Sequence, residues 1–245
     1  MLKKPFKILS NTEIAPKTYE LRLAGRAEIN RPGQFMDFSL PGFFLRRPLS
    51  VCDWTENSVT LIYKVIGSGT NLLSTLKPDT ILEALSPLGN GFDTAKSGAR
   101  PLVIGGGAGV PPMYGLIKAL VSEGKYPLAV LGWNTVREAF YIEKFSELGS
   151  PVTLVTADGS LGTRGLVTDA LPENYSYFFS CGPEPMLKAL CAASKTSGQL
   201  SFEARMGCGY GACMGCSCET LSGAKRICKD GPVLEKEEII WPTSR

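Results

Sequence analysis

The sequence of 245 residues predicts an α+β fold with more than one domain, on three observations. Residues 1–98 contain short segments of alternating apolar and polar residues between glycines and prolines, which is typical of an antiparallel sheet closing into a β-barrel. In residues 99–200, strands, glycine loops and helices alternate, which predicts a parallel α/β domain. Residues 201–245 form a small segment that holds five of the eight cysteines. We therefore expect three domains with these boundaries.

The composition excludes several kinds of chemistry. The sequence has no histidine, so this chain alone cannot build a Ser-His triad, a histidine-bearing zinc site, a histidine-ligated haem or a Rieske centre. A net charge of +3 with interspersed signs is too weak to indicate nucleic-acid or membrane binding. No apolar run approaches the length of a membrane span, and the first residues lack a signal-peptide core, so we expect a cytoplasmic protein.

In the first part, the clearest strand candidates are 18–23 and 59–65, and a short helix is expected near 71–76. A β-sandwich without a ligand fits the same alternation. Arg46 and Arg47 stand side by side next to a strand, where guanidinium groups could clamp a phosphate. A pair of solvated surface charges is the alternative, and taken alone these two residues favour that alternative.

The second part alternates strand and helix candidates. Parallel strands need a crossover connection, and the helices supply it. Ligands of open α/β sheets bind beyond the carboxyl ends of the strands, so the residues that follow each strand are candidates for a site. The expected strands are 102–104, 128–131, 151–156 and 177–180, and the expected helices are 113–122, 137–148 and 184–194.

Two segments follow strands of this sheet. The first is a glycine loop that lacks the G-x-G-x-x-G pattern because Val110 takes the place of the last glycine. Its small residues still let backbone amides approach a pyrophosphate at the start of a helix. The second is Cys181-Gly182-Pro183. Since both segments follow strands of the same sheet, they could meet one ligand. A loop used only for packing and a free structural cysteine are the alternatives. The glycines concerned are Gly105, Gly106, Gly107 and Gly109.

The cysteines of the last part carry the most specific pattern. Cys208, Cys213 and Cys216, followed by the distal Cys228, give C-x4-C-x2-C…C, the ligand spacing of plant-type 2Fe–2S clusters. Structural zinc is a weaker alternative, because only Cys213 and Cys216 have the spacing of a zinc knuckle. Accidental cysteines or disulfides are weaker still in a chain without a signal peptide. We expect Cys218 to be a spare thiol and not a ligand.

Taken in order, these segments resemble the ferredoxin-reductase superfamily, and within it the electron-transfer subunits of dihydroorotate dehydrogenase B. The resemblance covers essentially the whole chain, and the cysteine-rich tail is its most specific part. It implies a first domain that binds FAD, an α/β domain that binds NAD, and one 2Fe–2S cluster in the last segment. The matching stretches are 46–50, 62–64, 69–70, 105–112, 181–183, 206–213 and 228–233.

The resemblance also assigns cofactor contacts. The family's R-x-x-S element falls on 47–50, which places Arg47 near the FAD phosphates and Ser50 near the flavin ring. Leu49 stands where other members have a tyrosine stacked on the flavin, which excludes aromatic stacking from this position. The FAD contacts implied are Arg47, Pro48, Leu49, Ser50, Ile62, Tyr63, Lys64, Gly69 and Thr70, and those for the nucleotide are Gly105, Gly106, Gly107, Gly109, Cys181, Gly182 and Pro183. The cluster ligands implied are Cys208, Cys213, Cys216 and Cys228.

The activity implied is that of an oxidoreductase subunit in pyrimidine biosynthesis. In the family, a partner subunit oxidises dihydroorotate to orotate on FMN, and electrons pass through the 2Fe–2S cluster and FAD to NAD⁺ in a heterotetramer. FAD is the converter because a nicotinamide exchanges two electrons and a cluster takes one. No catalytic side chain is expected, since the cofactors carry the chemistry. Alternatives are a reductase subunit of a hydrogenase or of a ferredoxin-dependent transhydrogenase, and a zinc-bearing interaction module.

Overall fold

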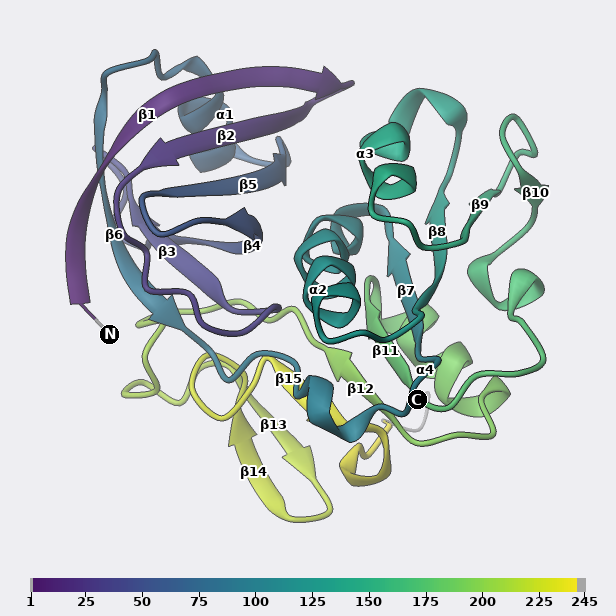
Figure 1. Ribbon diagram of the computed structural model, residues 1–245. Coiled ribbons are helices and arrows are strands. Elements are labelled where there is room, and N and C mark those ends of the chain that lie inside the picture. Colours follow the sequence, from purple (N-terminus) through teal and green to yellow (C-terminus); the bar gives the residue numbers. More distant parts are fainter. Residues whose placement is uncertain (1, 242–245) are drawn as a thin grey trace.

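The computed structural model describes residues 2–241, and the first part of the chain is a closed antiparallel barrel (Figure 1). The strands follow the order β1-β2-β5-β4-β3-β6 around it. The barrel confirms the expected fold of this part and sets the β-sandwich aside. The strands are β1 (Leu2–Ala15), β2 (Thr18–Ala24), β3 (Phe35–Ser39), β4 (Arg47–Trp54), β5 (Ser58–Lys64) and β6 (Ile81–Leu88).

Alternation along the strands fills the barrel. Leu21 and Leu23 of β2 are fully buried in its core, whereas Arg22 between them is exposed, because successive side chains of a strand point to opposite faces. The helix α1 (Ser68–Thr75) adds Leu73 to the same core. This helix begins a few residues before the predicted 71–76, and Asn11 of β1 donates to the carbonyl of Leu73 at 2.8 Å.

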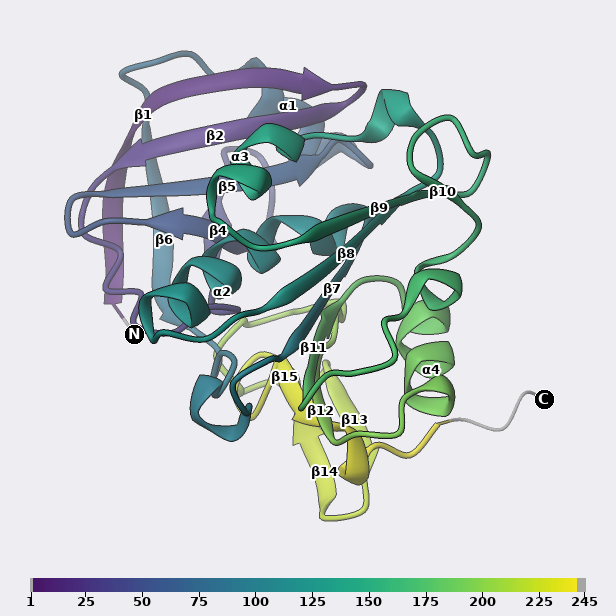
Figure 2. The ribbon, with the colours of Figure 1, turned by 45° about the vertical axis from the view of Figure 1, so that its right-hand side comes forward.

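The second part contributes most of a seven-stranded sheet in the order β10-β9-β8-β7-β11-β12-β15, in which all strands but β15 run parallel. Helix α2 (Val110–Ser122) packs between one face of the sheet and the barrel, and α4 (Glu184–Ala193) covers the other face (Figures 1 and 2). In β7, Val103 faces α2 while Leu102 and Ile104 face α4. The strands are β7 (Leu102–Gly106), β8 (Leu128–Trp133), β9 (Val152–Thr156), β10 (Thr163–Arg164), β11 (Phe178–Cys181), β12 (Gly198–Ser201) and β15 (Val233–Glu235).

All four strands expected in this part are present, but the helix predicted over 137–148 is wrong in extent. Only α3 (Ile142–Glu147) is α-helical there, after a 3₁₀ turn at Val136–Glu138. Tyr141 has a φ of 63°, which a right-handed helix cannot contain. The reason is tertiary: Phe140 is buried against Trp133, and Tyr141 packs on Tyr114 of α2.

The cysteine-rich segment lies against both other parts. Its hairpin consists of β13 (Ser217–Thr220) and β14 (Gly223–Arg226), and β15 then pairs antiparallel with β12. Phe35 and Leu88 of the barrel share a small core with Cys216 and Cys228. The sequence did not predict that this segment completes the sheet of the second part. The division at 201 remains a prediction: β15, which follows this boundary in the sequence, pairs with β12, which precedes it.

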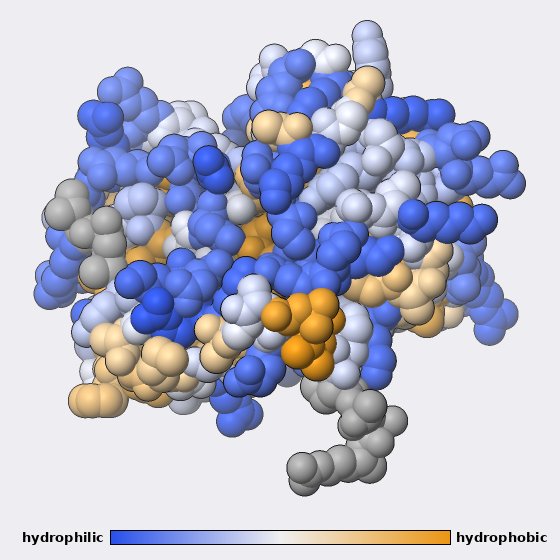
Figure 3. Space-filling view, turned by 90° about the horizontal axis from the view of Figure 1, so that it is seen from below, coloured by the Kyte–Doolittle hydropathy of each residue, from blue (hydrophilic) through white to orange (hydrophobic). Residues whose placement is uncertain are grey.

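The surface offers little apolar area on the side of the cysteine-rich segment. Seen from below, this face is mostly hydrophilic, with apolar atoms gathered in a few small patches (Figure 3). Tyr210, Met214 and Leu221 are among the exposed apolar side chains of the segment. Within residues 2–241, no helix combines the length and the apolar character that a membrane crossing requires.

Candidate functional site

The side chain of Arg47 lies against the first turn of α1. Arg47 is the first residue of β4, and a Cβ added to Gly69 would lie 2.1 Å from its Nε, so the side chain crosses the helix directly over this glycine. Its Nη1 donates to the carbonyl of Leu45 at 2.6 Å, and the guanidinium lies 4.7 Å from the centre of the Phe43 ring. A fixed guanidinium and a helix N-terminus together favour a bound anion. The alternative of a freely solvated arginine pair therefore does not describe Arg47.

Other residues of the expected FAD site serve the fold itself. Thr70 caps α1: its hydroxyl accepts hydrogen bonds from the backbone N–H of Ile66 at 3.0 Å and of Gly67 at 3.2 Å. Leu49 packs against the barrel core. Pro48 stands opposite Asp37 and Ser50 opposite Phe35 in the β3–β4 pair.

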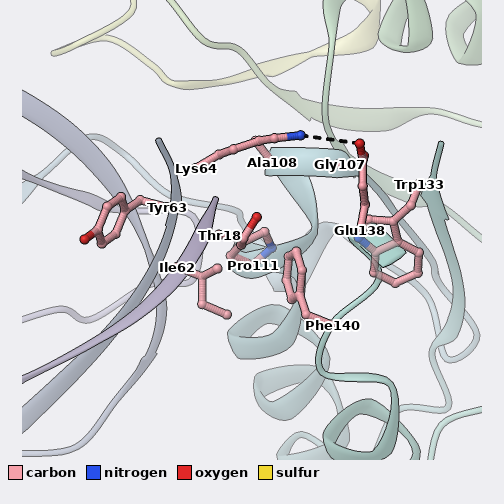
Figure 4. A pocket seen from close by; sticks show the side chains of 10 residues that line it. All are labelled: Thr18, Ile62, Tyr63, Lys64, Gly107, Ala108, Pro111, Trp133, Glu138 and Phe140. Atoms are coloured by element: carbon pink, nitrogen blue, oxygen red, sulfur yellow. Dashed lines mark ion pairs between the residues drawn. The ribbon is translucent and has the colours of Figure 1, made fainter. Parts of the chain in front are cut away.

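The end of β5 sends its side chains in two directions. The Tyr63 hydroxyl donates to Asn11 at 3.0 Å, and its ring stacks on Tyr19 in the barrel. Burial raises the pKa of Tyr63 far above its usual value. Ile62 and Lys64 point instead to the second part of the chain, where Lys64 pairs with Glu138 at 3.7 Å (Figure 4). Since Tyr63 turns away from the other residues in Figure 4, only its backbone can contact a ligand on that side.

These two side chains belong to a pocket between the barrel and the sheet. Figure 4 shows Lys64 on the barrel side, with Trp133 and Phe140 on the other. The sequence predicted Ile62, Tyr63, Lys64 and Gly107 here and missed most of the other lining residues. Trp133 ends β8, so the rule that ligands sit beyond the carboxyl ends of strands could have found it. The lining residues are Thr18, Ile62, Tyr63, Lys64, Gly107, Ala108, Pro111, Trp133, Glu138 and Phe140.

The glycine loop and the Cys181-Gly182-Pro183 segment touch each other, because β7 and β11 are parallel neighbours. A Cβ on Gly109 would lie 2.2 Å from the carbonyl oxygen of Cys181. Gly107, with a φ of +53°, has no atom within 4 Å of such a Cβ and faces open space. Close packing and room for a ligand thus occur in the same loop. Burial raises the pKa of Cys181 to about 12, which keeps it a neutral thiol.

The four predicted cluster cysteines form two pairs. In each pair the second cysteine donates its backbone N–H to the sulfur of the first: Cys213 to Cys208 and Cys228 to Cys216, both at 3.4 Å. Other backbone N–H groups also point at the sulfurs: Ala212 donates to Cys208 at 3.2 Å, and Gly215 to Cys213 at 3.4 Å. Partial burial alone would raise the pKa of Cys208, but these N–H donors lower it to about 6. Such donors stabilise thiolate sulfur.

Arg226 joins the two ends of the segment that carries the four cysteines, residues 208–228, which we call the cysteine loop. Its Nη1 donates to the carbonyl of Gly211 at 2.9 Å, and its Nε donates to Asp230 at 2.8 Å. The hydrogen bonds from Arg226 lower the pKa of Asp230 to about 2. The stretch that follows Cys228 is thereby held beside the loop that carries Cys208. Sequence reasoning used Asp230 only as part of a motif and missed Arg226 altogether.

The donor set fits a 2Fe–2S cluster. In such a cluster each of two irons takes two thiolates, which matches two pairs of cysteines with N–H groups directed at their sulfurs. A single zinc ion needs its ligands gathered in one tetrahedral group. Among residues 2–241, no group of three or more potential ligands is placed to hold one metal ion. Cys218 lies on β13 opposite Lys225, outside the two pairs.

The chain resembles known proteins along nearly its whole length. Residues 203–240 match the family model described as the iron–sulfur cluster binding domain of dihydroorotate dehydrogenase B. A protein of Geobacillus sp. (strain WCH70), named dihydroorotate dehydrogenase B (NAD(+)), electron transfer subunit, is 42% identical over 98% of this chain and 99% of its own. The chain belongs to this family. A Listeria monocytogenes protein of the same name is 40% identical over 98% of this chain and 99% of its own.

Two solved structures of other proteins share the fold of this chain. A chain of an NADH-dependent reduced ferredoxin-NADP oxidoreductase has a TM-score of 0.88 at 30% identity, covering 96% of this chain and 90% of its own. Phthalate dioxygenase reductase has a TM-score of 0.66 at 18% identity, covering 78% of this chain and 64% of its own, and supports the fold alone. The barrel followed by a parallel sheet is thus the ferredoxin-reductase fold.

In this family member, a buried carboxyl lies between the Arg47 site and the cysteine loop. Asp37 of β3 is 2% exposed, and a Cβ on Gly209 would lie 2.3 Å from its Oδ2. Its Oδ1 has no hydrogen-bond partner among the described residues. Burial raises the pKa of Asp37 to about 7, even though Arg46 and Arg47 act to lower it.

Asp37→Asn is expected to change how stability depends on pH. Between about pH 4 and 7 the folded protein binds a proton at Asp37 that the unfolded chain has released, so the free energy of unfolding falls as the pH rises through this window. Asparagine does not ionise, so the free energy of unfolding of the variant does not fall in this window. Toward pH 8 it rises relative to that of the wild type by at most about 4 kcal/mol. Thermal midpoints at pH 5 and pH 8 measure the change. The exposed Glu173→Gln is the control, and parallel pH profiles of Asp37→Asn and wild type would contradict the prediction.

Proposed function

We propose that this chain is the electron transfer subunit that links dihydroorotate oxidation on the FMN of a partner subunit to the reduction of NAD⁺, within a heterotetramer. For that role it holds FAD and a 2Fe–2S cluster. The names of its relatives support this proposal, and the paired thiols carry it. FAD, when bound, exchanges two electrons with a nicotinamide and single electrons with a cluster.

We assign the FAD site to residues 1–98 and the NAD site to residues 99–200. Arg47 and the N-terminus of α1 would hold the FAD phosphates, and the backbone of 62–64 would border the flavin. Gly107 and the N-terminus of α2 would hold the pyrophosphate of NAD⁺, because the loop leaves open space there. Cys181 is a neutral thiol that is neither a nucleophile nor a base at this site.

We assign the cluster to 201–245, with Cys208, Cys213, Cys216 and Cys228 as ligands. One pair of thiols lies toward solvent, since Cys213 is exposed, and the other pair is buried against the barrel. A cluster held this way would be reachable from outside and adjacent to the FAD domain. We propose that the partner docks around Cys213, where Tyr210 and Met214 expose 44% and 51% of their surface.

The test is co-purification followed by cofactor analysis. Expressed with its genomic neighbours under anaerobic conditions, the chain should retain about two irons and one FAD. Its complex should reduce NAD⁺ with dihydroorotate, and the isolated partner should hold FMN and oxidise dihydroorotate with an artificial acceptor. Zinc in place of iron, or a stable partner that does not oxidise dihydroorotate, would refute the proposal.

A further inference from the structure

The indole N–H of Trp133 is a buried donor without a partner. Trp133 is 6% exposed, and its Nε1 makes no hydrogen bond among the described residues. Leaving such a donor unsatisfied costs about 1–3 kcal/mol, so an unpaired buried N–H calls for an explanation. The indole ring lies 5.8 Å from the Phe140 ring at an interplanar angle of 76°, and both line the pocket between barrel and sheet.

The single carboxylate in the pocket lining already has partners. This carboxylate, Glu138, pairs with Lys64 at 3.7 Å and accepts a hydrogen bond from the Asn134 amide at 3.0 Å. Facing them is Gly107, in open space beside the N-terminus of the 13-residue helix α2. In Figure 4 the Trp133 nitrogen lies on the edge of the indole ring that faces Phe140. A ligand with several oxygen acceptors suits this lining.

The two walls of the pocket identify which part of a dinucleotide fits. One wall is the end of β5, which borders the flavin in the proposed function, and the other is the loop at Gly107, which takes the pyrophosphate. Hydride transfer requires the nicotinamide to reach the flavin. The half of NAD⁺ that lies between these walls is therefore the nicotinamide mononucleotide half, whose carboxamide, ribose and phosphate all offer oxygen acceptors.

We propose that Trp133 binds the nicotinamide half of NAD⁺ by donating its Nε1–H to an oxygen of that half. The inference rests on the proposed function and adds a positioning residue to it. The Lys64–Glu138 pair beside the pocket is long at 3.7 Å, and the Glu138 side chain is 30% exposed, so it has room to turn toward solvent when the ligand binds.

Trp133→Phe tests this, because phenylalanine keeps an aromatic ring in the pocket and removes only the N–H. Isothermal titration calorimetry on the oxidised complex, without dihydroorotate, gives the Kd of NAD⁺, of nicotinamide mononucleotide and of AMP. We expect the first two Kd values to rise about 3- to 10-fold, the worth of one neutral hydrogen bond, and that of AMP to stay unchanged. FAD and iron contents equal to wild type show that the fold is kept.

Trp241→Phe is the matched control, because Trp241 packs on Phe202 outside the pocket. It should leave all three Kd values unchanged. Wild-type affinity for NAD⁺ in Trp133→Phe, or an equal loss for AMP and nicotinamide mononucleotide, would overturn the role of Trp133 while the proposed function stands. Failure of the wild-type complex to bind NAD⁺ at all would refute both.

Discussion

Cys213→Ser is expected to reduce the EPR signal of the reduced 2Fe–2S cluster to less than about a tenth of wild type, together with electron transfer from the partner. Cys213 is paired with Cys208 and accepts the N–H of Gly215 at 3.4 Å. A serine hydroxyl is a harder donor that stays protonated near neutral pH, so one iron would lose half of its protein ligands. EPR of dithionite-reduced protein, with iron and sulfide analysis, measures the effect.

Cys218→Ser is the matched control for this prediction. Cys218 is two residues from Cys216 in sequence, but it lies on β13 opposite Lys225 and outside the two thiol pairs. The variant should keep a nearly unchanged signal. A native-like signal in Cys213→Ser would contradict the ligand set, and loss of the signal in Cys218→Ser would show that the spare thiol is a ligand.

Gly109→Ala is expected to destabilise the protein by about 3 kcal/mol and to weaken NAD⁺ binding. The added Cβ would lie 2.2 Å from the carbonyl oxygen of Cys181 and 2.5 Å from the backbone nitrogen of Gly182. These are backbone atoms, held in place because Cys181 is paired with Gly105 in the sheet. They cannot move aside like a flexible side chain, so the overlap must push α2 away from β11.

Thermal unfolding should show the Gly109→Ala midpoint about 6–12 °C below wild type. Gly67→Ala is the control, since Gly67 is likewise the residue before a helix, has an extended φ of −163°, and has nothing within 4 Å of an added Cβ. It should cost about 1 kcal/mol or less. Equal midpoints for the two variants would mean that the contact between Gly109 and Cys181 is not tight in solution.

Local patterns in the sequence were sufficient for β7, β8, β9 and β11 and for the helices at 113–122 and 184–194, but they missed β10 and β12. Each depends on residues close along the chain: apolar runs for buried strands, and a 3.6-residue period for helices. The helix at 137–148 failed because the buried contacts of Phe140 and Tyr141 override a helical pattern. The barrel was one of two solutions for the same alternation, and only the pairing of β1 with both β2 and β6 closes it.

The site divides in the same way. The glycine loop and the four cysteines were named because a phosphate cradle or a cluster needs particular residue types at short spacings, whereas Arg47 was assigned through the family resemblance. Trp133 was missed although it ends a predicted strand, whereas Glu138 was missed because it becomes part of the pocket only when it meets Lys64 of the barrel. The same holds for Asp37, which is remote in sequence from the Gly209 that covers it.

The sequence by itself determined which groups are available: no imidazole, a thiol set with cluster spacing, and small residues at the end of a buried strand. The tertiary structure decided which groups meet. It paired Cys208 with Cys213 and Cys216 with Cys228, placed Asp37 under the cysteine loop, and left the Trp133 N–H unsatisfied beside the pocket. The physical reason is that chemistry and local geometry are encoded residue by residue, whereas burial and contact across 100 residues exist only once the chain has packed.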